Sequence, residues 1–372
     1  QEEADDLLRR IRRGASVSLA APRRVGKTSL LHEVRRRLEE EGTATVFVDL
    51  EGAESPEDAI AEIAAKAESQ RALAARARGW VGWLLGATPV DLQMAKLDLR
   101  EALKVDWQTR GSRLFAELCA GDEPVVLFLD ELPVVVASLL AEPARPGRST
   151  ADLLLSWLRQ LVQEHRSLRI VITGSIGLAP LVERAGLSAT LNVYETTSLG
   201  PWSPPIATQA LHALAAYDGL VLGDGAAQQV VEELGLAVPY HVQLVHQALA
   251  EDARRRSSPH VSRDDVRRVW TERVLTRPSA DLPHWEQRLR RALSPPDYAL
   301  AVRLLTEAAV HEPLAVARAV ALADAADDPQ ATVRAVLATL EHDGYLGRTQ
   351  GGWYFPNRLL RAWWSDRHGP FA

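Results

Sequence analysis

The sequence predicts an α/β fold, in which helices cover both faces of a parallel β-sheet. Short apolar runs alternate along the first 200 residues with longer segments of helical periodicity. Two of these runs, Thr45–Leu50 and Val125–Leu129, are apolar almost throughout, as strands buried on both faces are. A loop with a phosphate-binding pattern joins the first strand to the first long helix. Alternation of this kind is typical of a parallel sheet.

Length and composition limit the classes of protein that need to be considered. A chain of 372 residues with 47% hydrophobic content has room for two to three domains. The single cysteine, Cys119, excludes an internal disulfide, and we expect an intracellular, cytoplasmic protein. The most apolar window, Trp80–Leu92, is shorter than the ~20 residues of a membrane span, so no membrane is expected. A net charge of −6 gives no general attraction to nucleic acid or anionic lipid.

The first elements surround the loop. An amphipathic helix over Glu2–Arg13 is expected to precede the strand Ser16–Ala20, and a helix follows until Gly42. The loop matches G-x-x-x-x-G-K-[ST] except that Ala21 replaces the first glycine. We expect contact with a nucleotide from Pro22, Arg23, Arg24, Val25, Gly26, Lys27, Thr28 and Ser29. Backbone N–H groups would surround the β-phosphate, Lys27 would reach the β- and γ-oxygens, and the Thr28 hydroxyl would bind Mg²⁺.

A long helical insertion, 69–112, is expected between the second and third strands. It contains Trp80, Trp83 and Trp107. These tryptophans either pack the insertion onto the sheet domain or, within 79–92, present an apolar surface to a partner or to a second copy.

The third strand supplies acidic side chains. Val125–Leu129 leads directly into Asp130 and Glu131, at the carboxyl end where α/β sheets bind ligands. We expect Asp130 to hold the Mg²⁺ shell and Glu131 to orient or deprotonate the attacking water.

The fourth strand, Ile170–Ser175, ends in small hydroxyl residues. Ser175, or alternatively Thr173, is expected to hydrogen-bond the water or the γ-phosphate. Val193–Leu199 then completes the sheet.

Several segments together resemble one family. They are Arg23–Leu30, Phe128–Pro133, Thr173–Ser175, Leu199–Ser203, Val238–Leu244, Asp343–Leu346 and Phe355–Trp364. The chain is similar in these segments to the archaeal-type ATPases, a branch of the AAA+/STAND P-loop NTPases related to the origin-recognition ATPases. The resemblance implies an AAA+-like P-loop NTPase fold with a five-stranded parallel sheet, a helical lid and a carboxyl-terminal winged helix.

The resemblance also implies site residues outside the loop. The family's lid proline, which lines the adenine pocket, corresponds to Pro239, with Tyr240 beside it and Gly235 as a looser match to the preceding glycine. Many members carry an arginine that reaches a neighbour's γ-phosphate, and Arg184 is the candidate here.

Three domains are therefore predicted. They are a P-loop ATPase domain over 1–200, a helical lid over 201–293 and a winged helix over 294–372. The lid is expected to hold four helices, and the last domain three helices followed by a hairpin turned at Gly351 and Gly352.

Two functions remain open at this point. The chain is either a slow Mg²⁺-dependent ATPase that acts as a conformational switch on a partner, or a nucleotide-gated scaffold or DNA-binding regulator with little turnover. Both bind ATP or ADP. Glu131 favours the first function, whereas the lack of an obvious transition-state arginine favours the second. A guanine-reading Asn-Lys-x-Asp motif does not occur. Residues 294–372 carry seven arginines against nine acids, so nucleic acid is only weakly supported as a partner and a protein partner fits this domain better.

Overall fold

The computed structural model describes residues 2–22, 24–86, 95–141, 149–174, 176–276, 282–323 and 327–369. The chain divides into two compact units. The first unit comprises Gln1–Ala21 and Lys27–Leu199, and the second comprises Pro22–Gly26 and Gly200–Ala372. The three predicted domains, over 1–200, 201–293 and 294–372, stay a prediction.

The first unit is built on a five-stranded sheet with the order β2-β3-β4-β1-β5. Its strands are β1 (Ser16–Ala20), β2 (Ala44–Asp49), β3 (Val125–Asp130), β4 (Leu168–Gly174) and β5 (Tyr194–Ser198). Every pair of neighbours is parallel, which confirms the predicted fold class. All six residues of β3 are buried, as its uninterrupted apolar run predicts, whereas burial alternates along the edge strand β5.

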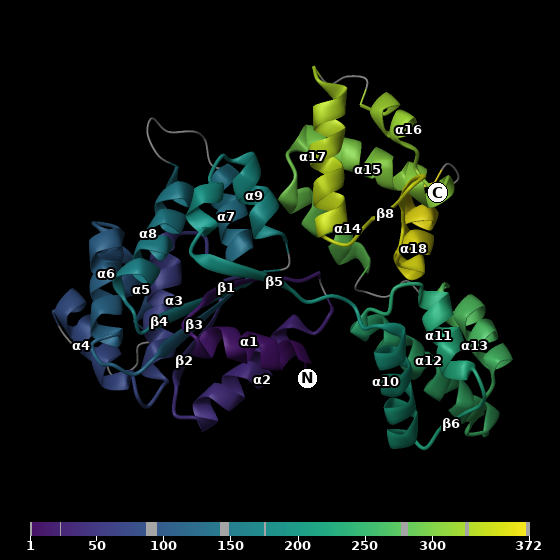
Figure 1. Cartoon of the computed structure of the whole chain (residues 1–372), viewed down its shortest axis with the longest axis horizontal. Helices are drawn as coiled ribbons and strands as arrows, with labels where there is room; N and C mark the ends of the chain where they lie inside the picture. Colours follow the sequence, from purple (N-terminus) through teal and green to yellow (C-terminus); the bar gives the residue numbers. More distant parts are fainter. Residues whose placement is uncertain are drawn as a thin grey trace. The chain divides into compact units, whose positions relative to one another are not determined.

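Helices cover both faces of this sheet (Figure 1). Those of the first unit are α1 (Glu2–Arg12), α2 (Lys27–Glu40), α3 (Pro56–Glu68), α4 (Ala74–Leu85), α5 (Lys96–Leu103), α6 (Trp107–Leu118), α7 (Leu132–Ala141), α8 (Thr150–Glu164) and α9 (Leu178–Arg184), with the short 3₁₀ turn η1 (Ser188–Leu191). Figure 1 shows α1 and α2 on one face and α7, α8 and α9 on the other, with α4, α5 and α6 beyond the β2 edge. Apolar side chains are therefore buried on both faces of the sheet. This packing holds the strands in place, so that their carboxyl ends lie along one edge of the sheet.

Two of the three tryptophans of the insertion help to pack it onto the rest of the unit. Trp80 is buried, and its indole N–H donates to the carbonyl oxygen of Arg110 at 2.9 Å. Trp107 meets Trp157 of α8 edge to face, with ring centroids 5.4 Å apart. Trp83 alone of the three is exposed, at 44%, with the Arg113 guanidinium 3.8 Å from its ring centroid. Residues 87–92 of the predicted partner surface lie outside the described residues.

The second unit is mostly helical. Its elements are α10 (Pro204–Tyr217), α11 (Ala226–Leu234), α12 (Pro239–Arg256), α13 (Arg263–Val269), the π-helical turn η2 (Trp270–Val274), α14 (Leu282–Ala292), α15 (Pro295–Val310), α16 (Val316–Ala321), α17 (Pro329–His342) and α18 (Arg358–His368). Two small sheets accompany them, β6 (Val221–Leu222) with β7 (His260–Val261), and the antiparallel hairpin β8 (Gly347–Thr349) with β9 (Gly352–Tyr354). The helices α14 and α18 and the β6–β7 pair are additions to the predicted elements.

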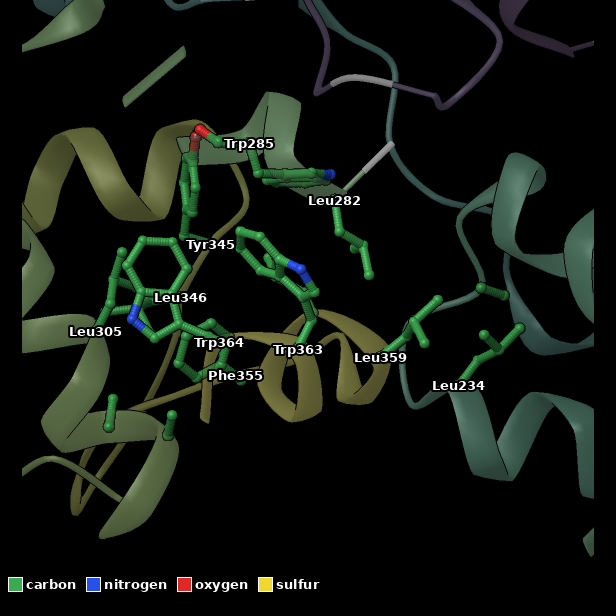
Figure 2. Close-up of a cluster of buried hydrophobic side chains, with 14 of the residues drawn as sticks. Leu234, Leu282, Trp285, Leu305, Tyr345, Leu346, Phe355, Leu359, Trp363 and Trp364 are labelled. Carbon is green, nitrogen blue, oxygen red and sulfur yellow. Dashed lines mark hydrogen bonds between the residues drawn. The ribbon is translucent and has the colours of Figure 1, made fainter. Parts of the chain in front are cut away.

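One apolar core runs through the second unit, from α10 to α18. Figure 2 shows Leu234 of α11 facing Leu359 of α18, and Trp363 and Trp364 extending the core toward Tyr345. Gly235, which ends α11 with φ of +69°, sits where a Cβ atom would lie 2.6 Å from the carbonyl oxygen of Pro356. The predicted lid and winged-helix segments are thus packed together within this unit.

No helix in the described part of the chain is long and apolar enough to cross a membrane.

Candidate nucleotide site

The phosphate loop connects β1 to α2, as predicted. Gly26 has φ of +94°, and Arg24 is also left-handed at +66°. A Cβ atom added to Gly26 would meet nothing within 4 Å, so this position requires glycine for its backbone angle and not for protein packing. Ala21 is not among the described residues with positive φ, which explains why alanine is tolerated at the first position of the pattern.

Helix α2 begins at Lys27, and its first turn contains no acidic residue. The N–H groups of a first turn have no partner within the helix and carry partial positive charge. Thr28 and Ser29 are exposed in this turn. The amino end of α2 therefore offers donors and a hydroxyl to an anion at the carboxyl end of β1.

The Lys27 ammonium lies between the two predicted acidic residues. Its Nζ atom is 2.8 Å from Asp130 Oδ1 and 2.8 Å from Glu131 Oε1. All three side chains are close to nine-tenths buried, because each is only 8–12% exposed. The structure therefore brings Lys27, Asp130 and Glu131 into one cluster, although they are about 100 residues apart in the sequence.

Asp130 is held by several donors at once. Its Oδ1 atom accepts a hydrogen bond from the Thr173 hydroxyl at 2.6 Å and another from the backbone N–H of Glu131 at 3.0 Å. Thr173 is fully buried on β4, the strand next to β3. The three donors on Oδ1, counting Lys27, fix the orientation of the carboxylate and leave Oδ2 as the oxygen with fewer protein contacts.

Glu131 occupies the junction between β3 and α7 with φ of +61°. A left-handed conformation costs a residue with a side chain roughly 1 kcal/mol, and such outliers concentrate at functional sites. The strand ends at Asp130 and the helix starts at Leu132, so this single residue makes the turn. The strained turn aims the carboxylate back at Lys27 instead of along the helix surface.

Gly174, at the end of β4, allows close packing behind the cluster. A Cβ atom there would lie 2.5 Å from Cδ and Cγ of Pro133 in α7. Only glycine accommodates this approach without a shift of the proline ring, which keeps β4 and Thr173 close to the β3–α7 turn.

The predicted adenine-pocket residues lie at the start of α12. Val238 is the N-cap and Pro239 is the first residue of the helix, as its fixed φ favours. Within the second unit, the Arg24 guanidinium stacks on the Tyr240 ring at 4.3 Å from its centroid, and the Tyr240 N–H donates to the Arg24 carbonyl oxygen at 3.3 Å. Arg24 of the loop and Tyr240 of the predicted lid, which were predicted separately, are therefore in direct contact.

The next residue, His241, continues the link toward α18. Its ring Nδ1 lies 2.9 Å from the side-chain amide of Asn357, and both residues are fully buried. The Asn357 Oδ1 atom in turn accepts the backbone N–H of Leu360 and caps α18. Neither residue was singled out in the sequence, because only the fold brings His241 and Asn357 together.

Among the other predicted residues, Ser175 and Arg23 lie outside the described residues. Arg184 is the last residue of α9 and is exposed, and its role stays a prediction. Gly235 has a packing role against Pro356. Thr173, the second choice for the fourth strand, is the residue that contacts Asp130.

Comparison of the sequence with protein-family profiles and with curated proteins gives no match. Comparison of the fold with solved structures does give matches. A Walker-type ATPase of Pyrococcus abyssi aligns with a TM-score of 0.64 and 15% identity, covering 98% of this chain and 95% of that one. The Aeropyrum pernix ORC2 protein, in ADPNP–ADP complexes, aligns with a TM-score of 0.55 and 16% identity, covering 97% and 92%. Similarity at this level of identity concerns the fold, and it extends over nearly the whole chain.

Proposed function

We propose that this chain, which has the fold of the AAA+ P-loop ATPases, binds Mg-ATP, hydrolyses it slowly, and uses the nucleotide to switch the conformation of its second unit. The observation that carries the proposal is the buried cluster of Lys27, Asp130 and Glu131 at the carboxyl ends of β1 and β3. A lysine and two carboxylates in contact at that edge supply a phosphate ligand, a metal ligand and a general base in one place.

The loop residues fit the phosphates of ATP or ADP. Arg24 and Gly26 have left-handed backbone angles, which are typical of anion-binding loops, and α2 adds the N–H groups of its first turn. Lys27 has three N–H donors, two of which face the carboxylates. It can therefore exchange a carboxylate for a phosphate oxygen without leaving the cluster.

Asp130 and Thr28 fit a magnesium ion. Mg²⁺ prefers carboxylate, hydroxyl and water oxygens, and it usually binds through one or two protein ligands together with phosphate oxygens. Asp130 has its Oδ1 fixed by Thr173 and the Glu131 N–H, which leaves Oδ2 for the metal. The ion, when bound, neutralises charge on the β- and γ-phosphate oxygens.

Glu131 is proposed as the general base, because its strained turn places the carboxylate beside Lys27 and not in solvent. The proton of the attacking water would pass to a Glu131 carboxylate oxygen. Lys27, whose Nζ atom lies 2.8 Å from Glu131 Oε1, would orient that carboxylate.

Slow turnover is proposed from the position of Arg184, which is exposed at the end of α9. An arginine that stabilises the transition state contributes about 10³–10⁵ in rate in enzymes of this type. Arg184 would act on a neighbouring copy, so turnover would rise with protein concentration.

The switch is proposed from the contacts of the second unit. Arg24 belongs to the phosphate loop and stacks on Tyr240, and His241 continues to Asn357 at the cap of α18. A nucleotide that repositions Arg24 would disturb this chain of contacts. The segments 201–293 and 294–372, proposed as lid and winged helix, would then respond together because they share one core.

The second candidate function is a nucleotide-gated scaffold or DNA-binding regulator with little turnover. The exposed Trp83 ring favours a protein partner or self-association through the insertion. A DNA-binding role has less support than a protein partner, because the exposed face of α17 offers one full positive charge, Arg334, among alanines. A cytoplasmic location is part of this proposal and rests on the sequence.

A turnover assay with matched variants tests hydrolysis. ATP hydrolysis is measured for the parent and for Glu131→Gln over a hundredfold range of protein concentration, with Glu123→Gln, an exposed glutamate before β3, as the control. We expect slow turnover in the parent and in the control, and none in Glu131→Gln. Hydrolysis by Glu131→Gln at the parent rate would refute the assignment of the base, and fast turnover that is independent of dilution would refute the role given to Arg184.

A further inference from the structure

A polar cavity lies at the amino ends of β3 and β4, the end of the sheet opposite to the nucleotide cluster. Its volume is 410 Å³, which is large enough for a small molecule. The six residues of β3 span about 20 Å, so the cavity is well separated from Asp130. The α6–β3 and α8–β4 connections line it, with Cys119, Asp122, Glu164, His165, Arg166 and Arg169 among the lining residues.

Backbone hydrogen bonds hold the two connections together. The Val125 N–H at the start of β3 donates to the Ser167 carbonyl oxygen at 2.9 Å. The Leu168 N–H at the start of β4 donates to the His165 carbonyl oxygen at 3.0 Å. Both acceptor residues line the cavity. The main chain therefore sets the shape of the cavity, as is usual for binding sites that are largely formed in advance.

Arg169 brings a positive charge into the wall of this cavity from a central strand. It is the second residue of β4, and every other residue of that strand is buried. Within the described residues no carboxylate pairs with it, and burial lowers the pKa of its guanidinium without an opposing charge. A partly buried charge of this kind is normally compensated by a charge of opposite sign.

The Arg169 guanidinium is held in place with one nitrogen left for a ligand. Its Nη1 donates to the carbonyl oxygens of Leu168, at 3.1 Å, and of Arg166. Its Nε is buried, so Nη2 is the nitrogen that remains. A Cβ atom at Gly14 would lie 3.3 Å from Nη2, so the glycine leaves this nitrogen uncovered.

The other charged residues of the cavity do not neutralise Arg169. Arg166 is exposed, lines the cavity and makes no ion pair with a described residue. The two acids, Asp122 and Glu164, are exposed, and neither lowers the charge on Arg169. Glu164 instead accepts a hydrogen bond from Gln160 at 2.7 Å. The cavity therefore combines two arginines without partner acids with two carboxylates that lie apart from Arg169.

We propose that this cavity binds the oxyanion group, carboxylate or phosphoryl, of a small metabolite, with Arg169 and Arg166 as its donors. Arginine only donates and keeps its charge at any pH that a folded protein experiences, so the group that it binds accepts hydrogen bonds and is negative. Ionised Asp122 and Glu164 only accept, so the rest of the ligand carries hydroxyl or amine donors. The proposal does not depend on nucleotide binding.

Cys119 reports whether the cavity is occupied. It is the only cysteine of the chain, it is half-buried, and it lines the cavity. Burial raises the pKa of its thiol, so its alkylation by iodoacetamide is followed at a fixed alkaline pH by mass spectrometry. A ligand in the cavity restricts access to the thiol and slows this reaction. Phosphate bound at the phosphate loop, at the other end of the strands, does not cover Cys119.

The alkylation rate of the full chain is measured in potassium chloride, inorganic phosphate and succinate at equal ionic strength. The parent is compared with Arg169→Met and with the control Arg71→Met, an exposed arginine between α3 and α4. We expect phosphate or succinate to slow alkylation of the parent and of the control in a saturable way. Arg169→Met should need about 10- to 100-fold more anion for the same effect, as expected for hydrogen bonds between charged groups. The more effective anion distinguishes a phosphoryl from a carboxylate ligand.

Arg166→Met changes an exposed side chain, should weaken the same response, and serves if Arg169→Met does not fold. Alkylation of the parent that neither anion slows would overturn the site. Equal slowing in the parent and in both arginine variants would do so as well. An Arg169→Met variant that unfolds at a much lower temperature than the parent, with its anion response unchanged, would identify a structural arginine and also overturn the site.

Discussion

Replacing Thr173 with valine tests whether the buried hydroxyl positions Asp130. The two side chains have nearly the same shape, so the change removes one donor with little effect on packing. Thr173 is 1% exposed and its hydroxyl lies 2.6 Å from Asp130 Oδ1. A hydrogen bond to a charged group contributes about 1.5–3 kcal/mol. Lys27 and the Glu131 N–H still donate to the same oxygen, so we expect a loss near the lower end, about 2 kcal/mol.

Two assays follow this change. For a unit of this size, about 2 kcal/mol lowers the unfolding midpoint by about 4–8 °C. Asp130 would also be less well oriented for Mg²⁺. The Mg²⁺ concentration needed to support ATP binding should therefore rise by about tenfold or more, as it does when a residue that orients a metal ligand is mutated. Thr196→Val, on the exposed side of β5, is the matched control and should change neither quantity. If Thr173→Val and Thr196→Val behave alike in both assays, Thr173 does not position Asp130.

Three further predictions concern stability and partners. Asp252 is 2% exposed and is surrounded by arginines, with Arg268 as the strongest partner, and its pKa is lowered to about 2. Asp252→Ala should therefore cost about 3 kcal/mol at neutral pH, with the exposed Asp264→Ala nearly silent. Because the folded pKa lies below the ordinary value of 3.8, this contribution is present above pH ~4 and is lost as the pH falls toward 2, so urea unfolding of parent and variant should converge there. A stability difference that is unchanged at pH 2 would contradict this ion-pair account. Gly174→Ala should lower the unfolding midpoint, because the added Cβ atom would lie 2.5 Å from the Pro133 ring. Gly79→Ala, with open space around that position in α4, should not lower it. Equal midpoints for the two variants would show that β4 and α7 can move apart without cost. The full chain should bind mixed-sequence duplex DNA no more tightly than about 10⁻⁴ M at physiological salt, and micromolar binding that weakens steeply with salt would restore the DNA-binding alternative.

The strands and the acidic pair were accessible to sequence reasoning for a physical reason. A strand buried on both faces must be apolar throughout, so Val125–Leu129 stands out, and two acids directly after such a run are costly unless they are partnered. The glycine of the loop likewise reports a backbone angle that other residues avoid. Local rules of this kind are visible in one sequence.

Contacts between distant segments were not accessible in the same way. The partnership of Thr173 with Asp130 depends on β4 lying beside β3, and a sequence does not state strand order. The stacking of Arg24 on Tyr240 joins residues more than 200 positions apart, and neither residue type signals the other. Helix α14 was absorbed into the end of the predicted lid, and the burial of Arg288 runs against the ordinary exposure of arginine.

Binding of Mg-ATP is the measurement that tests the central claim most directly. Isothermal titration of the parent, of Lys27→Ala and of the control Lys66→Ala, an exposed lysine of α3, compares proteins that differ by one ammonium group. Lys27 contacts both site carboxylates, so its loss removes the phosphate ligand and leaves two acids facing the nucleotide. We expect saturable binding to the parent and to Lys66→Ala, and binding at least about 100-fold weaker to Lys27→Ala. A parent that binds no Mg-ATP, or a folded Lys27→Ala that binds it as tightly as the parent, would contradict the account.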